Sequence, residues 1–277
     1  MRVDRAISAM TALGLAIPML LTAGSAHAHQ PVVVDSETIE VVDPEISKAY
    51  YGVLSGAAHT YMITSDIEFD LYVGILVPDS ETPKRDVKAE IFRDDELLET
   101  LGGVDAEWVT FYEPFAQNTY WDGGEFRLRA APGVYSVRVS SPDNASKYSL
   151  AIGEIEYFGL EDRANALAVL PSIQQEFFGI SAIELVGTRY GLLNLLVIYA
   201  VALITALLYT VTLRRPLARL IGGRLRGIDR RFRVAAAVAL FAVAITTTWS
   251  PLLLFASGLL IFGALFSRSG VAEANRS

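Results

Sequence analysis

The feature that most constrains this chain is a run of 22 residues without a single charge, from Leu192 to Leu213. About 20 apolar residues are needed for a helix to cross the roughly 30 Å hydrocarbon layer of a membrane. The run therefore predicts a transmembrane helix over residues 191–213. The composition agrees with this prediction, because 52% of the residues are hydrophobic and the mean hydropathy is +0.36.

The two flanks of this helix carry opposite charge. Residues 29–189 hold 12 Asp and 16 Glu against 11 basic residues, whereas residues 214–233 hold eight arginines and one acid, Asp229. Basic flanks stay on the cytoplasmic side of a membrane. We therefore expect a cell-membrane protein whose main domain is extracytoplasmic and acidic. The net charge of −8 argues against nucleic acid as a partner.

The arginines of residues 214–233 alternate with apolar residues at helical spacing, which is typical of a basic amphipathic segment on the inner leaflet. The segment serves either to fix the topology on membrane lipids or to bind a cytoplasmic partner. The arginines expected at the membrane surface are Arg214, Arg215, Arg219, Arg224, Arg226, Arg230, Arg231 and Arg233.

The ends of the chain add two further predictions about the membrane. A basic start, an apolar run and the motif Ala26-His27-Ala28 predict a signal peptide over residues 1–28; the alternatives are a cut after Ala26 and an uncleaved anchor.

Residues 234–266 are apolar but too long for one comfortable span, at about 50 Å as a helix. We favour a hairpin broken near residues 246–251 over one kinked helix, with the tail 267–277 cytoplasmic.

Residues 29–158 alternate apolar and polar side chains between turn signals, which predicts an all-β sandwich of about eight to nine antiparallel strands. A hairpin is expected around Asp94-Asp95, and the last three strands are expected to form a meander. Residues 159–190 are predicted to form an amphipathic connector with helical spacing. The expected strands are 58–63, 69–77, 87–92, 97–101, 125–129, 134–139 and 147–152.

The stretch from Phe126 to Val139, with Gly133, Tyr135, Val137 and Val139 in alternation, resembles the closing strands of pre-peptidase C-terminal-like β-sandwich domains of secreted bacterial proteins. The likeness continues through residues 147–150 and covers about 30 residues. In that family such domains are small accessory sandwiches without catalytic activity. The resemblance therefore implies a sandwich fold and a non-catalytic role.

Residues 108–121 are rich in aromatic side chains beside amides, a composition that suits contact with a sugar or a protein. Most of these aromatics are expected in the core, and Tyr120 and Trp121 are expected to be the most exposed. The candidate binding residues are Trp108, Tyr112, Tyr120 and Trp121.

Two groups of residues are candidate metal ligands. Cleavage before His29 leaves an N-terminal amine and imidazole that can bind copper, with His59 as a further ligand. Asp66, Glu68 and Asp70 alternate along the chain and offer oxygen ligands for calcium. For both groups, a solvated terminus or acidic surface without metal is the competing interpretation.

The sequence contains no recognisable catalytic motif and no cysteine, which excludes disulfides, thiolate metal sites and a cysteine nucleophile. We therefore expect a non-catalytic, membrane-anchored binding module without a cofactor, acting as a sensor or accessory subunit with a protein partner in the membrane or envelope. The alternative is a copper- or calcium-binding extracytoplasmic protein.

Overall fold

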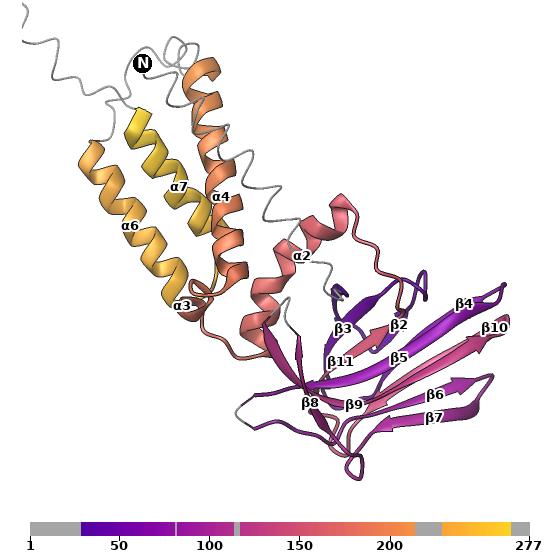
Figure 1. Cartoon of the computed structure of the whole chain (residues 1–277). Coiled ribbons are helices and arrows are strands. Elements are labelled where there is room, and N and C mark those ends of the chain that lie inside the picture. The colour runs from indigo at the N-terminus through magenta and orange to yellow at the C-terminus, as the bar shows by residue number, and fades with distance from the viewer. Residues whose placement is uncertain (1–28, 81, 114–116, 214–228, 267–277) are drawn as a thin grey trace, which may run out of the picture. The chain divides into compact units, whose positions relative to one another are not determined.

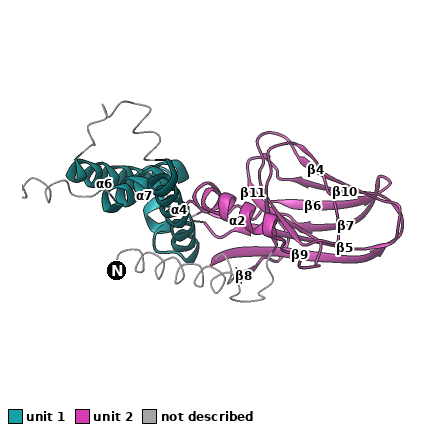
Figure 2. Cartoon of the chain, turned by 90° about the horizontal axis from the view of Figure 1, so that it is seen from above, with its two compact units in different colours: residues 1–23, 181–277 teal, residues 24–180 magenta. Residues whose placement is uncertain are grey.

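The computed structural model describes residues 29–80, 82–113, 117–213 and 229–266. These residues form two compact units, 29–180 and 181–266 (Figure 2). The first unit consists mainly of strands and the second of helices. The predicted signal peptide 1–28 and the tail 267–277 lie outside the described residues.

The first unit is a sandwich of two sheets (Figure 1). The six-stranded sheet has the order β1-β3-β11-β5-β9-β8, and the five-stranded sheet has the order β2-β4-β10-β6-β7. The strands are β1 (Gln30–Val33), β2 (Thr38–Glu40), β3 (Lys48–Val53), β4 (His59–Ser65), β5 (Phe69–Pro78), β6 (Lys88–Arg93), β7 (Glu96–Gly102), β8 (Val109–Glu113), β9 (Asn118–Ala130), β10 (Gly133–Ser140) and β11 (Lys147–Ile152).

All seven strands expected from the alternation of side chains are present, as β4 to β7 and β9 to β11. The predicted hairpin is confirmed, because β6 and β7 pair antiparallel with Arg93 opposite Glu96. Asp94 and Asp95 between them have φ angles of 46° and 68°. Positive φ at both central residues is what a two-residue type I′ turn requires.

The predicted strand count and pairing are wrong in three respects. The unit has eleven strands instead of eight or nine, and with the predicted helical connector included it is not all-β. It is not wholly antiparallel, because β1 pairs with β3 and β2 with β4 in parallel. The meander is also wrong, since β10 lies in the opposite sheet from β9 and β11. The apolar–polar alternation along a strand is the same whether the next strand pairs with it in the same sheet or lies in the opposite sheet. The sequence pattern therefore does not distinguish a meander from this arrangement.

Tyrosine side chains form the middle of the sandwich core. Tyr61, Tyr135 and Tyr148 are fully buried. Buried hydroxyl groups need hydrogen-bond partners. The Tyr148 hydroxyl lies 2.8 Å from that of Tyr61 and 2.7 Å from Nδ1 of His59, while the Tyr135 hydroxyl donates to the carbonyl of Ala131. Burial raises the pKa of the Tyr148 hydroxyl and lowers the pKa of His59, so this network is neutral.

The predicted connector is helical and packs on the sandwich. It forms α2 (Leu160–Ser172) and the short π-helical turn η1 (Ile173–Phe177). Ile173 and Phe177 pack with Tyr120 of β9. Lys147 of β11 donates to the carbonyl oxygens of residues 176 and 177, which fixes the end of η1 to the sheet. Gln174 is only 2% exposed, because η1 turns that side towards the domain.

The second unit consists of α3 (Ala182–Leu185), α4 (Arg189–Leu208) with its π-helical continuation η2 (Tyr209–Leu213), α6 (Arg230–Thr246) and α7 (Pro251–Phe266). Together α4 and η2 form one 25-residue helix that is long and apolar enough to cross a membrane. Thr188 begins it by accepting the amide hydrogen of Gly191 at 3.0 Å. The second apolar stretch is divided into α6, of 17 residues, and α7, of 16 residues.

Within this unit α7 packs against both α4 and α6 (Figure 1). Small residues permit the close approach, as is usual between membrane helices. A Cβ built on Gly258 would lie 2.8 Å from the Cβ of Ala202. Polar bonds also link the helices, among them Tyr199 with Ser257 at 3.0 Å and Trp249 with Asn194 at 2.8 Å.

Candidate interaction surface

Tyr120 is not an exposed binding residue, contrary to the prediction. Its side chain is 2% exposed, its ring packs edge-on against Phe178, and its hydroxyl lies 3.1 Å from that of Tyr51. The pair is removed from water, and burial raises the pKa of Tyr51 to about 12. The prediction failed because β9 begins at Asn118, which turns Tyr120 towards the face that η1 covers.

Trp108 is half-buried and has a structural role. Its indole nitrogen donates to the carbonyl of Gly103 at 3.0 Å, and its ring packs at the margin of the core. A Cβ built on Gly123 would lie 2.7 Å from the ring, so glycine is needed there for close approach. The side chain therefore closes one end of the sandwich and offers little area to a ligand.

Trp121 is also half-buried, and polar groups surround it. Its indole nitrogen donates to Asp79 at 2.9 Å, and the guanidinium of Arg85 lies 4.4 Å from the ring centre. A cation over an indole face is favourable by about 0.5–1 kcal/mol at an exposed site. This contact occupies the face of the ring that a sugar would otherwise stack on.

Of the four candidates, Tyr112 has the character expected of a binding residue. It lies in β8 and is 55% exposed, and its neighbours Val109 and Phe111 are 59% and 43% exposed. Because β8 is the last strand of its sheet, these side chains lie at an open edge. Sequence reasoning missed Val109 and Phe111 because the stretch Val109-Thr-Phe-Tyr shows no alternation that marks a half-buried strand.

The residues proposed to bind copper are not brought together. His29 lies 2.5 Å from the hydroxyl of Ser47, just before β3, whereas His59 contacts Tyr148, which pairs with Gly52. Five residues of strand separate these points, or roughly 16 Å at about 3.3 Å per residue. The two histidines are thus held by different partners at separate points of the sandwich.

The residues proposed to bind calcium do not form a site either. Residues 66–68 form a bend between β4 and β5 rather than an extended segment. Glu68 and Asp70 both pair with Arg129, and Asp66 is exposed. Throughout the described part of the chain, no three His, Asp or Glu side chains are grouped as metal ligands would be.

A second ion-pair cluster on the sheet surface is centred on Arg127. Arg127 bridges Glu125 at 2.6 Å and Glu154 at 2.8 Å, and its guanidinium lies over the ring of Tyr72. The hydrogen bond from Arg127 lowers the pKa of Glu125. A carboxylate held ionised by an arginine is a poor proton donor at neutral pH, so this cluster has a structural role.

The predicted membrane-surface arginines are only partly described. Arg214, Arg215, Arg219, Arg224 and Arg226 lie outside the described residues. Arg230, Arg231 and Arg233 form the first turn of α6, where Asp229 caps the helix. Arg233 donates to the carbonyl of Gly263 at 3.1 Å, close to the end of α7, where a cation also interacts favourably with the helix dipole.

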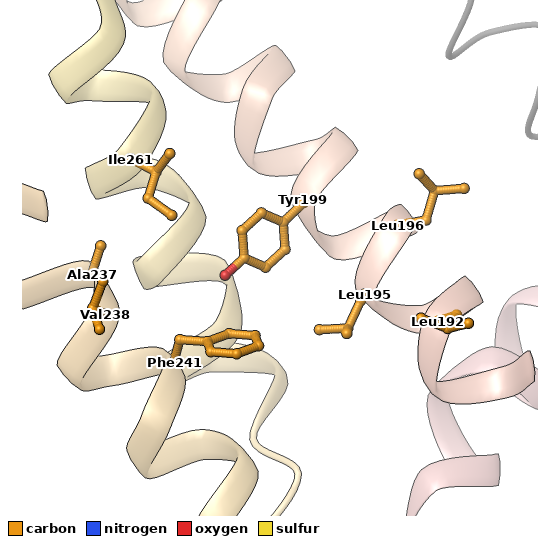
Figure 3. A pocket seen from close by; sticks show the side chains of 8 residues that line it. All are labelled: Leu192, Leu195, Leu196, Tyr199, Ala237, Val238, Phe241 and Ile261. Carbon is orange, nitrogen blue, oxygen red and sulfur yellow. The ribbon is translucent and has the colours of Figure 1, made fainter. Parts of the chain in front are cut away.

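The helical unit contains a groove of about 560 Å³ (Figure 3). Its lining is almost wholly hydrocarbon, and the Tyr199 hydroxyl beside it is bonded to Ser257. Such a lining suits a hydrocarbon chain or an apolar helix and supplies no acid, base or nucleophile for a reaction. The lining residues are Leu192, Leu195, Leu196, Tyr199, Ala237, Val238, Phe241 and Ile261.

No protein-family model matches the chain. No curated protein matches it either. Among solved structures, it is similar to the pre-peptidase C-terminal domain of a collagenase from Bacillus anthracis, with 9% identity and a TM-score of 0.24, over 45% of this chain and 94% of that one. It is also similar to a β-glucosidase from Paenibacillus barengoltzii, with 9% identity and a TM-score of 0.23, over 45% of this chain and 13% of that one.

The chain thus bears a weak resemblance to the pre-peptidase C-terminal domain, as its closing strands predicted. At this identity and TM-score, the likeness says nothing of ligand or activity.

Proposed function

We propose that this chain is a membrane-anchored, non-catalytic module whose β domain binds a partner protein outside the membrane. The observation that carries the proposal is the open edge at β8, where Val109, Phe111 and Tyr112 expose apolar surface in a strongly acidic domain. Exposed apolar patches of this kind mark interaction sites on soluble domains.

Anchoring is supported by the 25-residue helix of α4 and η2. Its length and its lack of charge fit a membrane span. The acidic composition before it and the arginines after it favour the orientation with the β domain outside. The smaller helices α6 and α7 then form a hairpin that returns the chain to the cytoplasmic side.

A binding role fits the described side chains better than catalysis does. The carboxylates of Glu68, Asp70 and Glu125 are paired with arginines, and His59 is buried in the tyrosine network. A general base must be within hydrogen-bond reach of a bound substrate. Neither the paired carboxylates nor the buried imidazole meets that requirement.

The absence of cysteine in the chain permits a clean test of topology. Single variants Thr82→Cys, Thr248→Cys and Ser277→Cys are treated with a membrane-impermeant maleimide in right-side-out membrane vesicles. We expect labelling of the first two, and labelling of Ser277→Cys only after the vesicles are opened. Protection of Thr82→Cys in sealed vesicles would refute the proposed function, while external labelling of Ser277→Cys would refute only the hairpin.

Binding is tested with a photo-crosslinking amino acid placed in the membrane-bound chain at Tyr112 and, as a control, at Ile67. Ile67 is 72% exposed in the bend before β5, whose first residue pairs with Ala130, at the opposite end of β9 from the residues that pair with β8. We expect one discrete adduct from position 112, lost on Phe111→Ser, and none from position 67. Equal adducts at both positions would show that β8 is not the binding surface.

A further inference from the structure

The two sheets have four edges, and three of them are protected. Helix α2 packs against β1, and the Gln30 side chain donates to the carbonyl of Tyr157. The edge strand β2 has only three residues. The edge strand β7 carries Glu96 and Glu99 and has an irregular register with β6. Short strands, charges and bulges are the usual devices that keep a sheet edge from pairing.

The fourth edge, β8, is less protected, because its only charge is Glu113 at its end and its register with β9 is regular. Its first four residues are uncharged and exposed, and no other described strand pairs with the side that faces away from β9. Its side chains alternate between faces, so Val109 and Phe111 share one face and Thr110 and Tyr112 the other. The pairing of Phe111 with Tyr120 and of Thr110 with Trp121 fixes this register. The outer row of backbone groups is thus available to another strand.

The chain on either side of β8 is acidic, since residues 94–126 contain nine acidic residues and no lysine or arginine. In the sheet Asp122 lies opposite Val109, and Arg85, which lies over the ring of Trp121, is a cation beside this edge. Two copies of this edge would bring these charges together, which opposes pairing between identical domains. The same charges attract a basic segment. The acidic residues are Asp94, Asp95, Glu96, Glu99, Asp105, Glu107, Glu113, Asp122 and Glu125.

We infer that β8 accepts an extended segment of the partner protein as an additional strand, and that this segment carries lysine or arginine among apolar residues. The inference rests on the proposed function and specifies the partner at the same site. Backbone hydrogen bonds to β8 supply affinity, and alternate side chains supply selectivity. Apolar residues of the segment cover Val109 and Phe111, while its basic residues lie near the exposed acids Asp105 and Glu107.

The test uses the full chain in nanodiscs and three synthetic ten-residue peptides as probes: alternating valine and lysine, alternating valine and glutamate, and a scrambled peptide with proline at every third position. Hydrogen exchange of the backbone is followed by mass spectrometry. We expect the valine-lysine peptide to slow exchange in residues 109–113 and the other two to leave it unchanged. Affinity should fall as salt is raised, because exposed charges are screened.

Two variants separate the edge from the rest of the surface. Phe111→Ser should weaken binding of the valine-lysine peptide about tenfold, in the range of an aromatic interface anchor. Ile67→Ser, which removes a similarly exposed apolar side chain elsewhere, should leave it unchanged. Equal loss in both variants would overturn the inference, as would equal binding of the valine-glutamate peptide.

The outcomes distinguish this inference from the proposed function. If position 112 crosslinks to a partner protein in membranes but no peptide protects residues 109–113, the strand-addition inference fails while the binding function stands. Association of two chains through β8 would also overturn the inference. If Thr82→Cys is protected in sealed vesicles, the proposed function fails independently of any peptide result.

Discussion

Replacing Gly52 with alanine tests how rigidly the tyrosine core is packed. Gly52 lies in β3 directly opposite Tyr148 of β11. A Cβ built on Gly52 would lie 2.5 Å from the hydroxyl oxygen and 2.6 Å from Cε1 of that tyrosine, both closer than real Cβ contacts. The ring is fully buried, and its hydroxyl is bonded to His59 and Tyr61. It cannot move aside without giving up those hydrogen bonds.

The expected cost follows from these contacts. Overpacking a well-filled core costs about 1–3 kcal/mol. Each hydrogen bond lost to the shift adds about 1 kcal/mol. Gly52→Ala should therefore lower the free energy of unfolding of the β domain by about 3 kcal/mol. Urea unfolding of the full chain in detergent micelles, followed by the fluorescence of Trp108 and Trp121, measures this difference.

The control is Val53→Ala on the same strand, which removes a half-exposed side chain and should change the free energy of unfolding by about 0.5 kcal/mol. A double-mutant cycle tests whether the destabilisation comes from the contact between residue 52 and Tyr148. Because Tyr148→Leu removes the ring that clashes, it should destabilise the Gly52→Ala protein less than the wild type. A Gly52→Ala protein as stable as the Val53→Ala control, or strictly additive effects in the cycle, would refute this account of the core.

Two further predictions concern pH and the helical unit. Burial depresses the pKa of His59 in the folded state, so the unfolded chain binds more protons and stability should fall as pH drops below about 6.5. The unfolding midpoint between pH 8 and pH 5 measures this loss, and His59→Gln should flatten the profile; an unchanged profile would exclude His59 as the cause. In the helices, Gly258→Ala brings a methyl group against Ala202, whereas the nearest atom to a Cβ on Gly263 is 3.9 Å away. Gly258→Ala should therefore lower the melting temperature of the full chain in micelles by several degrees relative to Gly263→Ala, and equal melting temperatures would contradict the packing of α4 against α7.

Strands with strict alternation were predictable, because one buried and one solvated face imposes a period of two on the sequence. The hairpin at Asp94-Asp95 was predictable too, since its turn is local. Strands β1 and β2 were not, because four and three residues are too few for alternation to be recognised. Their parallel pairing with β3 and β4 depends on contacts that no local pattern encodes.

The candidate binding residues also depend on contacts between distant parts of the chain. Aromatic composition indicated that residues 108–121 could bind a ligand, but composition does not say which of these side chains are covered by other segments. Tyr120 is buried by η1, which lies more than fifty residues later in the chain. Tyr112 is 55% exposed, and within the described β unit no strand pairs with the outer side of β8. The difference between the two tyrosines is thus set by tertiary packing.

In the helical unit, the positions of polar residues were easier to predict than their partners. Asn194, Tyr199, Thr205 and Thr210 all carry side chains that can donate or accept a hydrogen bond. The two threonines instead donate to carbonyls four residues earlier in their own helix. Only Tyr199 and Asn194 reach α7 and the turn before it. A threonine hydroxyl can bond to a carbonyl of its own helix, so its presence in a membrane-length helix does not indicate a bond to a neighbouring helix.

The uncharged edge strand favours pairing with another strand, whereas the acidic residues around it oppose pairing with a second copy of the chain. Together these two features limit what this domain can bind. An apolar edge alone would pair readily with any exposed strand, including that of a second copy held at the same membrane. The nine acids in residues 94–126 oppose pairing between copies through like-charge repulsion, while the strand itself stays free of charge up to Glu113. A basic extended segment is the class of partner that meets no such repulsion. The acidic residues beside the edge therefore select what β8 accepts, whereas the arginines of residues 214–233 favour the orientation in the membrane.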